Sequence, residues 1–269
     1  MKHILTVQDL SCMGKCSLTV ALPILSAMGC TCSVLPTAVL STHTAFPDPH
    51  VKDLTADLLP NAKHWASIGA SFDAISIGYL SDPEQAQAVM EVLSLFDCPV
   101  VLDPVMGDHG KLYSRMTAAN VAAMQKLCRK ADFLLPNLTE AAFLTGLPYV
   151  DQPDEAYLAE LTGKLLNFGV KAAVITGITW DDQTTGFAGI HAQTGSFSYR
   201  TPKLPGNQHG TGDMFSAVFC GCLLSGKNPK ESAATAAGFV EQVISSTKER
   251  STFGAPFEQH LPWLWQQIS

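Results

Sequence analysis

The stretch AISIGYLSDPEQAQAVMEVLSLFDCPVVLDPV, residues 74–105, decides the fold class. It begins and ends with short apolar runs, AISIGYL and PVVLDPV, which are typical of strands buried on both faces of a parallel sheet. Between them, Ser81 and Glu84 match a capping box and Pro83 suits the first turn of a helix. That helix has one apolar face, formed by Ala86, Val89, Met90, Leu93 and Phe96. The stretch therefore predicts two strands joined by a helix that covers the sheet.

The same alternation of strands and helices continues along the chain. Further apolar runs occupy four segments, 3–8, 32–39, 132–137 and 172–177, with amphipathic stretches between them. Residues 185–200 predict a β-hairpin that turns at 193–195, and residues 211–268 return to helices. We expect a three-layer αβα fold with a mainly parallel central sheet, built as a single domain over residues 1–269. Ligands of such folds bind beyond the carboxyl ends of the strands.

Composition narrows the class of protein further. The 269 residues are 46% hydrophobic and 15% charged, which excludes intrinsic disorder. A net charge of −7 without any basic run argues against nucleic acid or an anionic membrane as a partner. No stretch approaches 18 uninterrupted apolar residues, and the eight cysteines are scattered without a CxxC pair. These features predict a cytoplasmic protein with reduced thiols.

The segment from 207 to 216, NQHGTGDMFS, carries the strongest chemical signal. Gly210 and Gly212 flank Thr211 at the start of an apolar helix, where free backbone N–H groups and the helix dipole favour an anion. Asp213 lies beside that turn and could take a proton from a hydroxyl that attacks phosphorus. The alternative is an ordinary helix cap, in which Asp213 only satisfies N–H groups of the helix.

Two further acids follow predicted strands. Asp103 closes the run PVVLD, and Asn137 and Glu140 lie three residues apart at the start of a helix. Asp103 and Glu140 together could hold a hydrated Mg²⁺, which needs only one or two carboxylates in addition to nucleotide phosphates. Asn137 and Glu140 also match a capping box, which is a purely structural alternative.

Polar groups at the ends of other predicted strands are further candidates for the ligand-binding edge of the sheet. Thr176 and Gly177 end one strand and could contact a nucleotide phosphate, although a simple turn explains them equally well. Asp9 ends the first strand, and His43 and Thr44 end the second. His43 is also explained as a structural histidine. The Walker A and dinucleotide fingerprints are both missing from the sequence.

The order of these motifs resembles the pyridoxal kinase branch of the ribokinase-like superfamily. The motifs span most of the chain and are VQDLSCMG at 7–14, STHT at 41–44, GYL at 78–80, DPVMG at 103–107, PNLTE at 136–140, ITG at 175–177 and GTGD at 210–213. The resemblance implies ATP-dependent phosphorylation of the 5'-hydroxymethyl group of pyridoxal, pyridoxine or pyridoxamine. ATP and Mg²⁺ are the implied cofactors, and a homodimer is expected because relatives are commonly dimers.

The resemblance also assigns roles to individual residues. Asp213 matches the catalytic base, and Gly210, Thr211 and Gly212 match the anion hole. Positions matching the magnesium and nucleotide site are Asp103, Asn137, Glu140, Thr176 and Gly177. Positions on the substrate side are Asp9, His43, Thr44 and Tyr79. Asp9 departs from the family pattern, because many relatives have a serine that faces the pyridine nitrogen.

Three alternatives to a pyridoxal kinase stay open at this point. Hydroxymethylpyrimidine kinases share the DPVM and PN motifs, but Asp213 and the N-terminal VQDLSCMG favour the pyridoxal branch. Sugar kinases of the superfamily usually add a lid, for which the chain has no obvious insertion. A nucleotide- or vitamin-binding regulator without catalysis would keep the binding residues but would not need Asp213.

Overall fold

One nine-stranded sheet forms the centre of the protein in the computed structural model, which describes residues 1–204, 209–247, 249 and 251–268. The strand order is β11 (Gly195–Pro202), β10 (Thr184–His191), β9 (Ala172–Thr179), β8 (Phe133–Leu134), β5 (Val100–Leu102), β4 (Ala74–Ile77), β1 (Lys2–Met13), β2 (Cys30–Thr42) and β3 (Val51–Asp53). The six strands from β9 to β2 are parallel, whereas β3, β10 and β11 pair antiparallel with their neighbours. The prediction of a mainly parallel sheet is confirmed.

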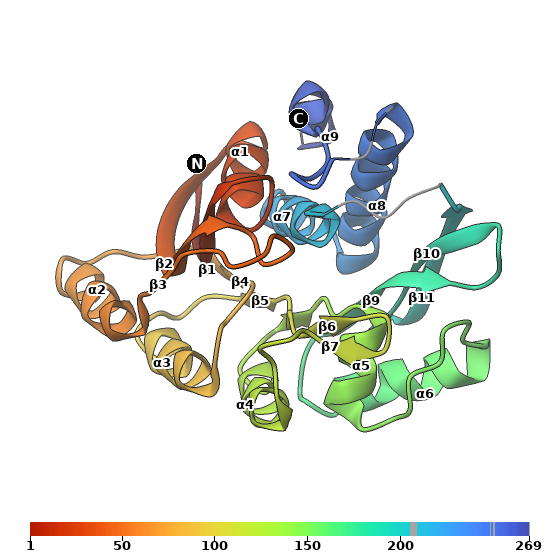
Figure 1. The fold of residues 1–269 in the computed structure, drawn as a ribbon, viewed down its shortest axis with the longest axis horizontal. Helices are drawn as coiled ribbons and strands as arrows, with labels where there is room; N and C mark the ends of the chain where they lie inside the picture. The colour runs from red at the N-terminus through yellow and green to blue at the C-terminus, as the bar shows by residue number, and fades with distance from the viewer. Residues whose placement is uncertain (205–208, 248, 250, 269) are drawn as a thin grey trace.

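Helices cover both faces of this sheet, so the predicted three-layer arrangement is also confirmed (Figure 1). One face carries α2 (Thr55–Ser67), α3 (Pro83–Leu93), α4 (Ala118–Cys128), α5 (Leu138–Thr145) and α6 (Glu155–Leu166). The other carries α1 (Leu18–Ala27), α7 (Thr211–Leu224), α8 (Pro229–Ser246) and α9 (Leu261–Ile268), preceded by the 3₁₀ turn η1 (Glu258–His260). Two separate apolar cores fill the layers, one under each set of helices. Burial of these cores is the main stabilising term of the fold.

Local details of the fold differ from the sequence prediction at three places. Helix α3 is capped by Asp82, whose carboxylate accepts the Gln85 N–H at 2.9 Å, so the capping box expected from Ser81 and Glu84 is wrong. The Ser81 N–H instead donates to the Gln85 side chain at 2.9 Å. The short strand β3 and the small hairpin of β6 (Gly107–Asp108) and β7 (Lys111–Leu112) were not predicted. They are too short to leave a periodic pattern.

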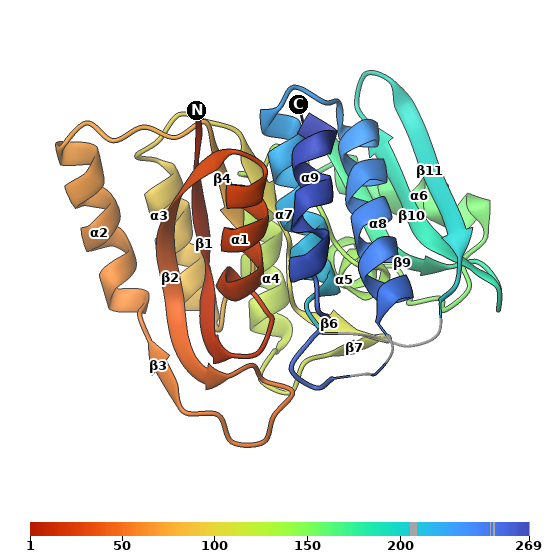
Figure 2. The same ribbon diagram turned by 90° about the horizontal axis from the view of Figure 1, so that it is seen from above.

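The parallel strands place their carboxyl ends along one edge of the sheet. Figure 2 shows this edge, with the ends of β1 and β2 and the β6–β7 hairpin on the same side of the molecule. The site residues expected from the sequence follow β2, β4, β5 and β8, lie on β1 and β9, or begin α5 and α7. Asp9 does not end the first strand as expected, because β1 continues to Met13, and β9 continues past Thr176 and Gly177 to Thr179. The topology therefore gathers them at one edge. No helix among the described residues is long and apolar enough to cross a bilayer.

Candidate active site

Asp213 is the third residue of α7, in the first turn of that helix. The helix begins after Gly210, which has the left-handed conformation with φ 85°. A side chain at Gly210 would place its Cβ 2.3 Å from the Lys15 carbonyl oxygen, so only glycine allows the close approach of these two segments. Thr211 and Gly212 form the first two helical residues. The first turn of α7 therefore presents backbone N–H groups close to the Asp213 carboxylate.

The partners of the Asp213 carboxylate lie in the loop after β1. The Ser17 backbone N–H and the Cys16 thiol both donate to it. Burial, followed by the charge of Asp9, raises the pKa of Asp213 to about 6, while the two hydrogen bonds oppose this rise. Gly210 caps α7 without a side-chain hydrogen bond. Contacts across to a separate loop favour a reactive carboxylate over a simple helix cap.

Asp103 follows the end of β5 and faces the same region. Its carboxylate accepts the Ser216 hydroxyl at 2.7 Å, and Ser216 lies one turn after Asp213 on α7. Burial and then the charge of Asp213 raise the pKa of Asp103 to about 7. The two acids therefore act on each other electrostatically across the sheet edge. Neither acid takes part in any of the ion pairs found among the described residues.

Glu140 is 2% exposed and begins α5 together with Asn137. The Asn137 side chain accepts the Glu140 N–H at 2.9 Å, and Glu140 Oε2 accepts the Asn137 N–H at 2.8 Å, so the capping box is formed. Glu140 Oε1 also accepts the Met106 N–H at 3.0 Å, which ties the loop after β5 to α5. Burial and the charge of Asp103 raise the pKa of Glu140. The carboxylate thus holds two segments of the candidate site together.

We predict that Glu140→Gln lowers the free energy of unfolding by about 1–3 kcal/mol, because an amide NH₂ must face one of two buried backbone N–H groups. Urea unfolding in metal-free buffer measures this change. If Glu140 also helps to hold Mg²⁺, the variant needs more Mg²⁺ for half-maximal turnover. Unchanged stability with a raised Mg²⁺ requirement would contradict the structural role.

Thr176 lies beside Asn137, because an isolated parallel bridge joins the two residues and the Thr176 N–H donates to the Pro136 carbonyl at 2.9 Å. Gly177 follows with φ 67°, and a Cβ built there meets no atom within 4 Å. The structure therefore brings together the two segments expected to contact a nucleotide. Gly177 leaves open space at this end of β9.

Asp9 is 4% exposed and has two serine partners. The Ser17 and Ser11 hydroxyls donate to its two carboxylate oxygens at 2.5 and 3.0 Å. Burial raises the pKa of Asp9, while these serine hydrogen bonds lower it. Tyr79 lies nearby, and burial followed by the charge of Asp9 raises the pKa of its hydroxyl. Asp9 and Tyr79 therefore lie on the same side of the site, as expected.

His43 is 4% exposed and belongs to an aromatic cluster over the site. Its ring centroid lies 4.9 Å from those of Phe46 and His209, and Phe46 lies 5.0 Å from Phe253. His43 Nε2 donates to the Thr252 carbonyl at 2.8 Å, a contact that supports a structural histidine. Thr44, the next residue, is exposed. Residues 207 and 208 of the glycine-rich motif lie outside the described residues.

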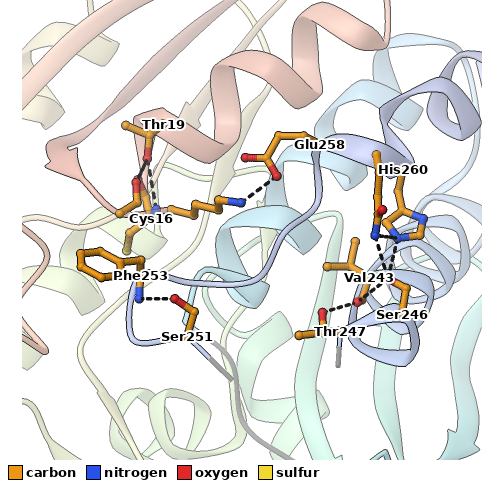
Figure 3. A network of polar contacts seen from close by, with 12 residues as sticks. Cys16, Thr19, Val243, Ser246, Thr247, Ser251, Phe253, Glu258 and His260 are labelled. Atoms are coloured by element: carbon orange, nitrogen blue, oxygen red, sulfur yellow. Dashed lines mark hydrogen bonds and ion pairs between the residues drawn. The ribbon is translucent and has the colours of Figure 1, made fainter. Parts of the chain in front are cut away.

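The segment after α8 completes the cluster. The Lys15 N–H donates to the Phe253 carbonyl at 2.6 Å, and the Lys15 ammonium pairs with Glu258 at 2.7 Å. Figure 3 shows Cys16 and Phe253 side by side, with the Glu258 carboxylate turned toward the same loop. Residues 251–258 therefore lie directly against the loop that contacts Asp213.

Comparison with known proteins identifies the family. The sequence profile described as phosphomethylpyrimidine kinase matches residues 22–257. The chain belongs to the phosphomethylpyrimidine kinase family. This family and its pyridoxal kinase relatives are part of the ribokinase-like superfamily, as the resemblance of the motifs indicated.

Individual members of the family are similar over nearly their whole length. A pyridoxine/pyridoxal/pyridoxamine kinase of Bordetella bronchiseptica is 28% identical, over 91% of this chain and 89% of its own. A Bacteroides thetaiotaomicron protein assigned as a phosphomethylpyrimidine kinase, crystallised with pyridoxal, is 34% identical with a TM-score of 0.92, over 98% and 96% of the two chains. Pyridoxal kinase of Lactobacillus plantarum is 32% identical with a TM-score of 0.90, over 99% and 97%.

Several residues of the candidate site were not predicted from the sequence. Cys16 and Ser17 contact Asp213 from almost 200 residues away, and no short motif marks them. Ser216 could have been found, because it lies three residues after Asp213 and so on the same side of α7. Residues 251–258 carry no pattern that links them to the strand ends.

Two surface cavities of the described part of the chain lie away from this site. One of about 270 Å³ is lined by Arg129, Leu144, Thr145, Lys164, Asn167 and Phe168, and one of about 250 Å³ lies around α3. Neither is lined by a predicted site residue. The candidate site is therefore defined by its carboxylates and by the glycine turn at the start of α7.

Proposed function

We propose that the chain transfers the γ-phosphoryl group of ATP to the 5'-hydroxymethyl group of pyridoxal, pyridoxine and pyridoxamine, giving the 5'-phosphate and ADP. The observation that supports this proposal most strongly is the position of Asp213. This half-buried acid lies in the first turn of a helix that begins after a glycine in the left-handed conformation. A kinase of 28% identity is named for the same three vitamers, and a relative of 34% identity was crystallised with pyridoxal.

The side chains fit this transfer. The alcohol oxygen attacks the γ-phosphorus while the bond from phosphorus to the β–γ bridging oxygen breaks, and ADP leaves. Asp213 takes the proton of the alcohol, which its hydrogen bonds from Ser17 and Cys16 orient it to do. The backbone N–H groups after Gly210 face the charge that develops on the phosphoryl oxygens. Asn137, Thr176 and Gly177 lie together and would contact the nucleotide phosphates.

Two carboxylates support a magnesium site in the proposal: that of the buried Glu140 and that of the half-buried Asp103. The charge of Asp103 raises the pKa of Glu140, and neither carboxylate is paired with a cation among the described residues. The described chain has no cluster of three or more His, Cys, Asp or Glu side chains arranged for a metal. Mg²⁺ suits a pair, since it keeps several waters and also binds phosphates. When bound, it would neutralise the negative charge of the triphosphate.

The pKa of Asp213 predicts how the rate depends on pH. A base must be ionised, and a pKa of about 6 means that Asp213 is mostly protonated in more acid solution. We therefore expect kcat/KM to be level above about pH 7 and to fall about tenfold per unit well below pH 6. Initial rates with pyridoxal from pH 5 to pH 8.5 measure this profile. A rate that rises as the pH falls would contradict the role of Asp213.

A panel of alcohols tests the proposed function. ATP consumption is measured in parallel with pyridoxal, pyridoxine, pyridoxamine, hydroxymethylpyrimidine and ribose. We expect the three vitamers to give the highest kcat/KM. Preference for hydroxymethylpyrimidine would favour the activity after which the family is described. Binding of pyridoxal without ATP consumption would instead indicate a regulator. A homodimer and a cytoplasmic location stay predictions.

A further inference from the structure

A chain of hydrogen bonds connects Asp9 to Asp213 through a single residue. The Ser17 hydroxyl donates to Asp9 Oδ1 at 2.5 Å, and the Ser17 backbone N–H donates to the Asp213 carboxylate. Asp9 lies on β1 and Asp213 on α7, so Ser17 joins two elements that are far apart in the sequence. Both acids therefore depend on the position of one serine.

Ser17 has a backbone conformation that L residues rarely adopt. Its φ is 52° and its ψ is −126°, in a region that favours glycine. Such a conformation persists only when its surroundings hold it in place. The Ser17 carbonyl accepts the N–H groups of Val20 and Ala21 at 3.0 and 2.9 Å, which fixes one side of the residue to α1. The hydroxyl bond to Asp9 fixes another.

This conformation aims the Ser17 N–H at Asp213. The neighbouring Cys16 thiol points at the same carboxylate, and the Cys16 N–H donates to the Thr19 hydroxyl at 3.2 Å. Rotation of the Ser17 backbone into an ordinary conformation would turn this N–H away from Asp213. The carboxylate would then lose an orienting hydrogen bond inside a site where small displacements are costly.

We propose that Asp9 is a positioning residue for the phosphoryl-transfer reaction: it holds Ser17 in its left-handed conformation, and Ser17 in turn orients Asp213. The inference rests on the proposed kinase function. It differs from a contact between Asp9 and the substrate in the partners that it assigns to Asp9, which are the Ser11 and Ser17 hydroxyls. A substrate contact affects binding of particular vitamers, whereas a positioning role affects turnover of all of them.

The two serines bound to Asp9 provide matched variants. Both hydroxyls donate to Asp9, but only Ser17 also contacts Asp213. We expect Ser17→Ala to lower kcat by about 10- to 100-fold with pyridoxal and with pyridoxine, and to leave KM within about threefold. Ser11→Ala should keep kcat within about twofold of the unmodified protein, since it leaves the path from Asp9 to Asp213 intact. Equal kcat values for the two variants would overturn the proposal.

Variants of Asp9 separate its hydrogen bond from its charge. Asp9→Ala and Asp9→Asn both remove the negative charge, but asparagine keeps an oxygen that can accept the Ser17 hydroxyl. We expect Asp9→Ala to lower kcat as Ser17→Ala does, and Asp9→Asn to recover most of that loss. The double variant Asp9→Ala with Ser17→Ala should be no slower than either single variant. A change of KM for one vitamer at constant kcat would overturn the proposal in favour of a substrate contact.

A second measurement does not depend on activity. Amide hydrogen exchange at Ser17, followed by NMR, should become faster in Asp9→Ala and stay unchanged in Ser11→Ala. Unchanged exchange in Asp9→Ala would overturn the proposal even if the protein is active. If the unmodified protein phosphorylates none of the five alcohols, the proposed function fails, and the exchange rates still decide whether Asp9 holds Ser17.

Discussion

Asp213→Asn is expected to lower kcat by about 100- to 10,000-fold, because it removes the group that takes the proton from the substrate alcohol. Asparagine has nearly the same size and keeps an oxygen that can accept the Ser17 N–H, so the loop after β1 keeps its place. KM for pyridoxal and for ATP should change little, since binding does not need the base. Initial rates of ADP formation at pH 8, where the unmodified carboxylate is ionised, give the comparison.

A change in stability should not explain the lower kcat of Asp213→Asn. The substitution removes a negative charge that raises the pKa of Asp103, so the free energy of unfolding should stay the same or rise. Asp154→Asn is the matched control: Asp154 caps α6 and accepts the Tyr157 N–H at 2.7 Å. Asparagine caps a helix about as well as aspartate. A kcat for Asp213→Asn within threefold of the control would exclude Asp213 as the base.

Gly210→Ala is expected to reduce both stability and turnover. Alanine at φ 85° is strained, and its Cβ would lie 2.3 Å from the Lys15 carbonyl, a backbone atom that cannot move alone. We expect the free energy of unfolding to fall by about 1–3 kcal/mol or more. We also expect kcat to fall by at least about tenfold, because the displaced N–H groups no longer face the transferred phosphoryl group. Urea unfolding and steady-state rates measure the two effects.

Gly212→Ala separates this steric effect from the loss of a glycine. Gly212 is helical, and a Cβ there meets no atom within 4 Å. Alanine should therefore stabilise the protein by about 0.5–1 kcal/mol through helix propensity. If Gly210→Ala proves as stable and as active as Gly212→Ala, the close approach of α7 to the Lys15 loop does not matter for the reaction.

The sequence predicts which residues gather at the carboxyl edge of the sheet better than it predicts the contacts that these residues make. Asp103 and Asn137 follow apolar strands and Thr176 lies in the second half of one, and parallel pairing brings such positions together. The Asn137–Glu140 capping box was also predictable, because a capping box is local in sequence. The cap of α3 was misplaced by one residue because serine and aspartate are both good caps.

The long-range contacts were not predictable from periodicity. The bonds of Ser17 to Asp9 and Asp213 depend on a left-handed serine, which propensity rules disfavour. The contact of Lys15 with Phe253 depends on how the last part of the chain crosses the sheet edge. Such features arise from tertiary packing, which overrides local preference.

The position of residues 251–258 has a consequence for protein synthesis. Thr252 and Phe253 accept hydrogen bonds from His43 and from the Lys15 backbone, so residues 251–258 support a loop that is synthesised well before them. A nascent chain on the ribosome can form the strands near its N-terminus long before these partners emerge. The site is thus completed only after residues 251–258 have emerged from the ribosome, and a chain that stops before them lacks these supporting contacts.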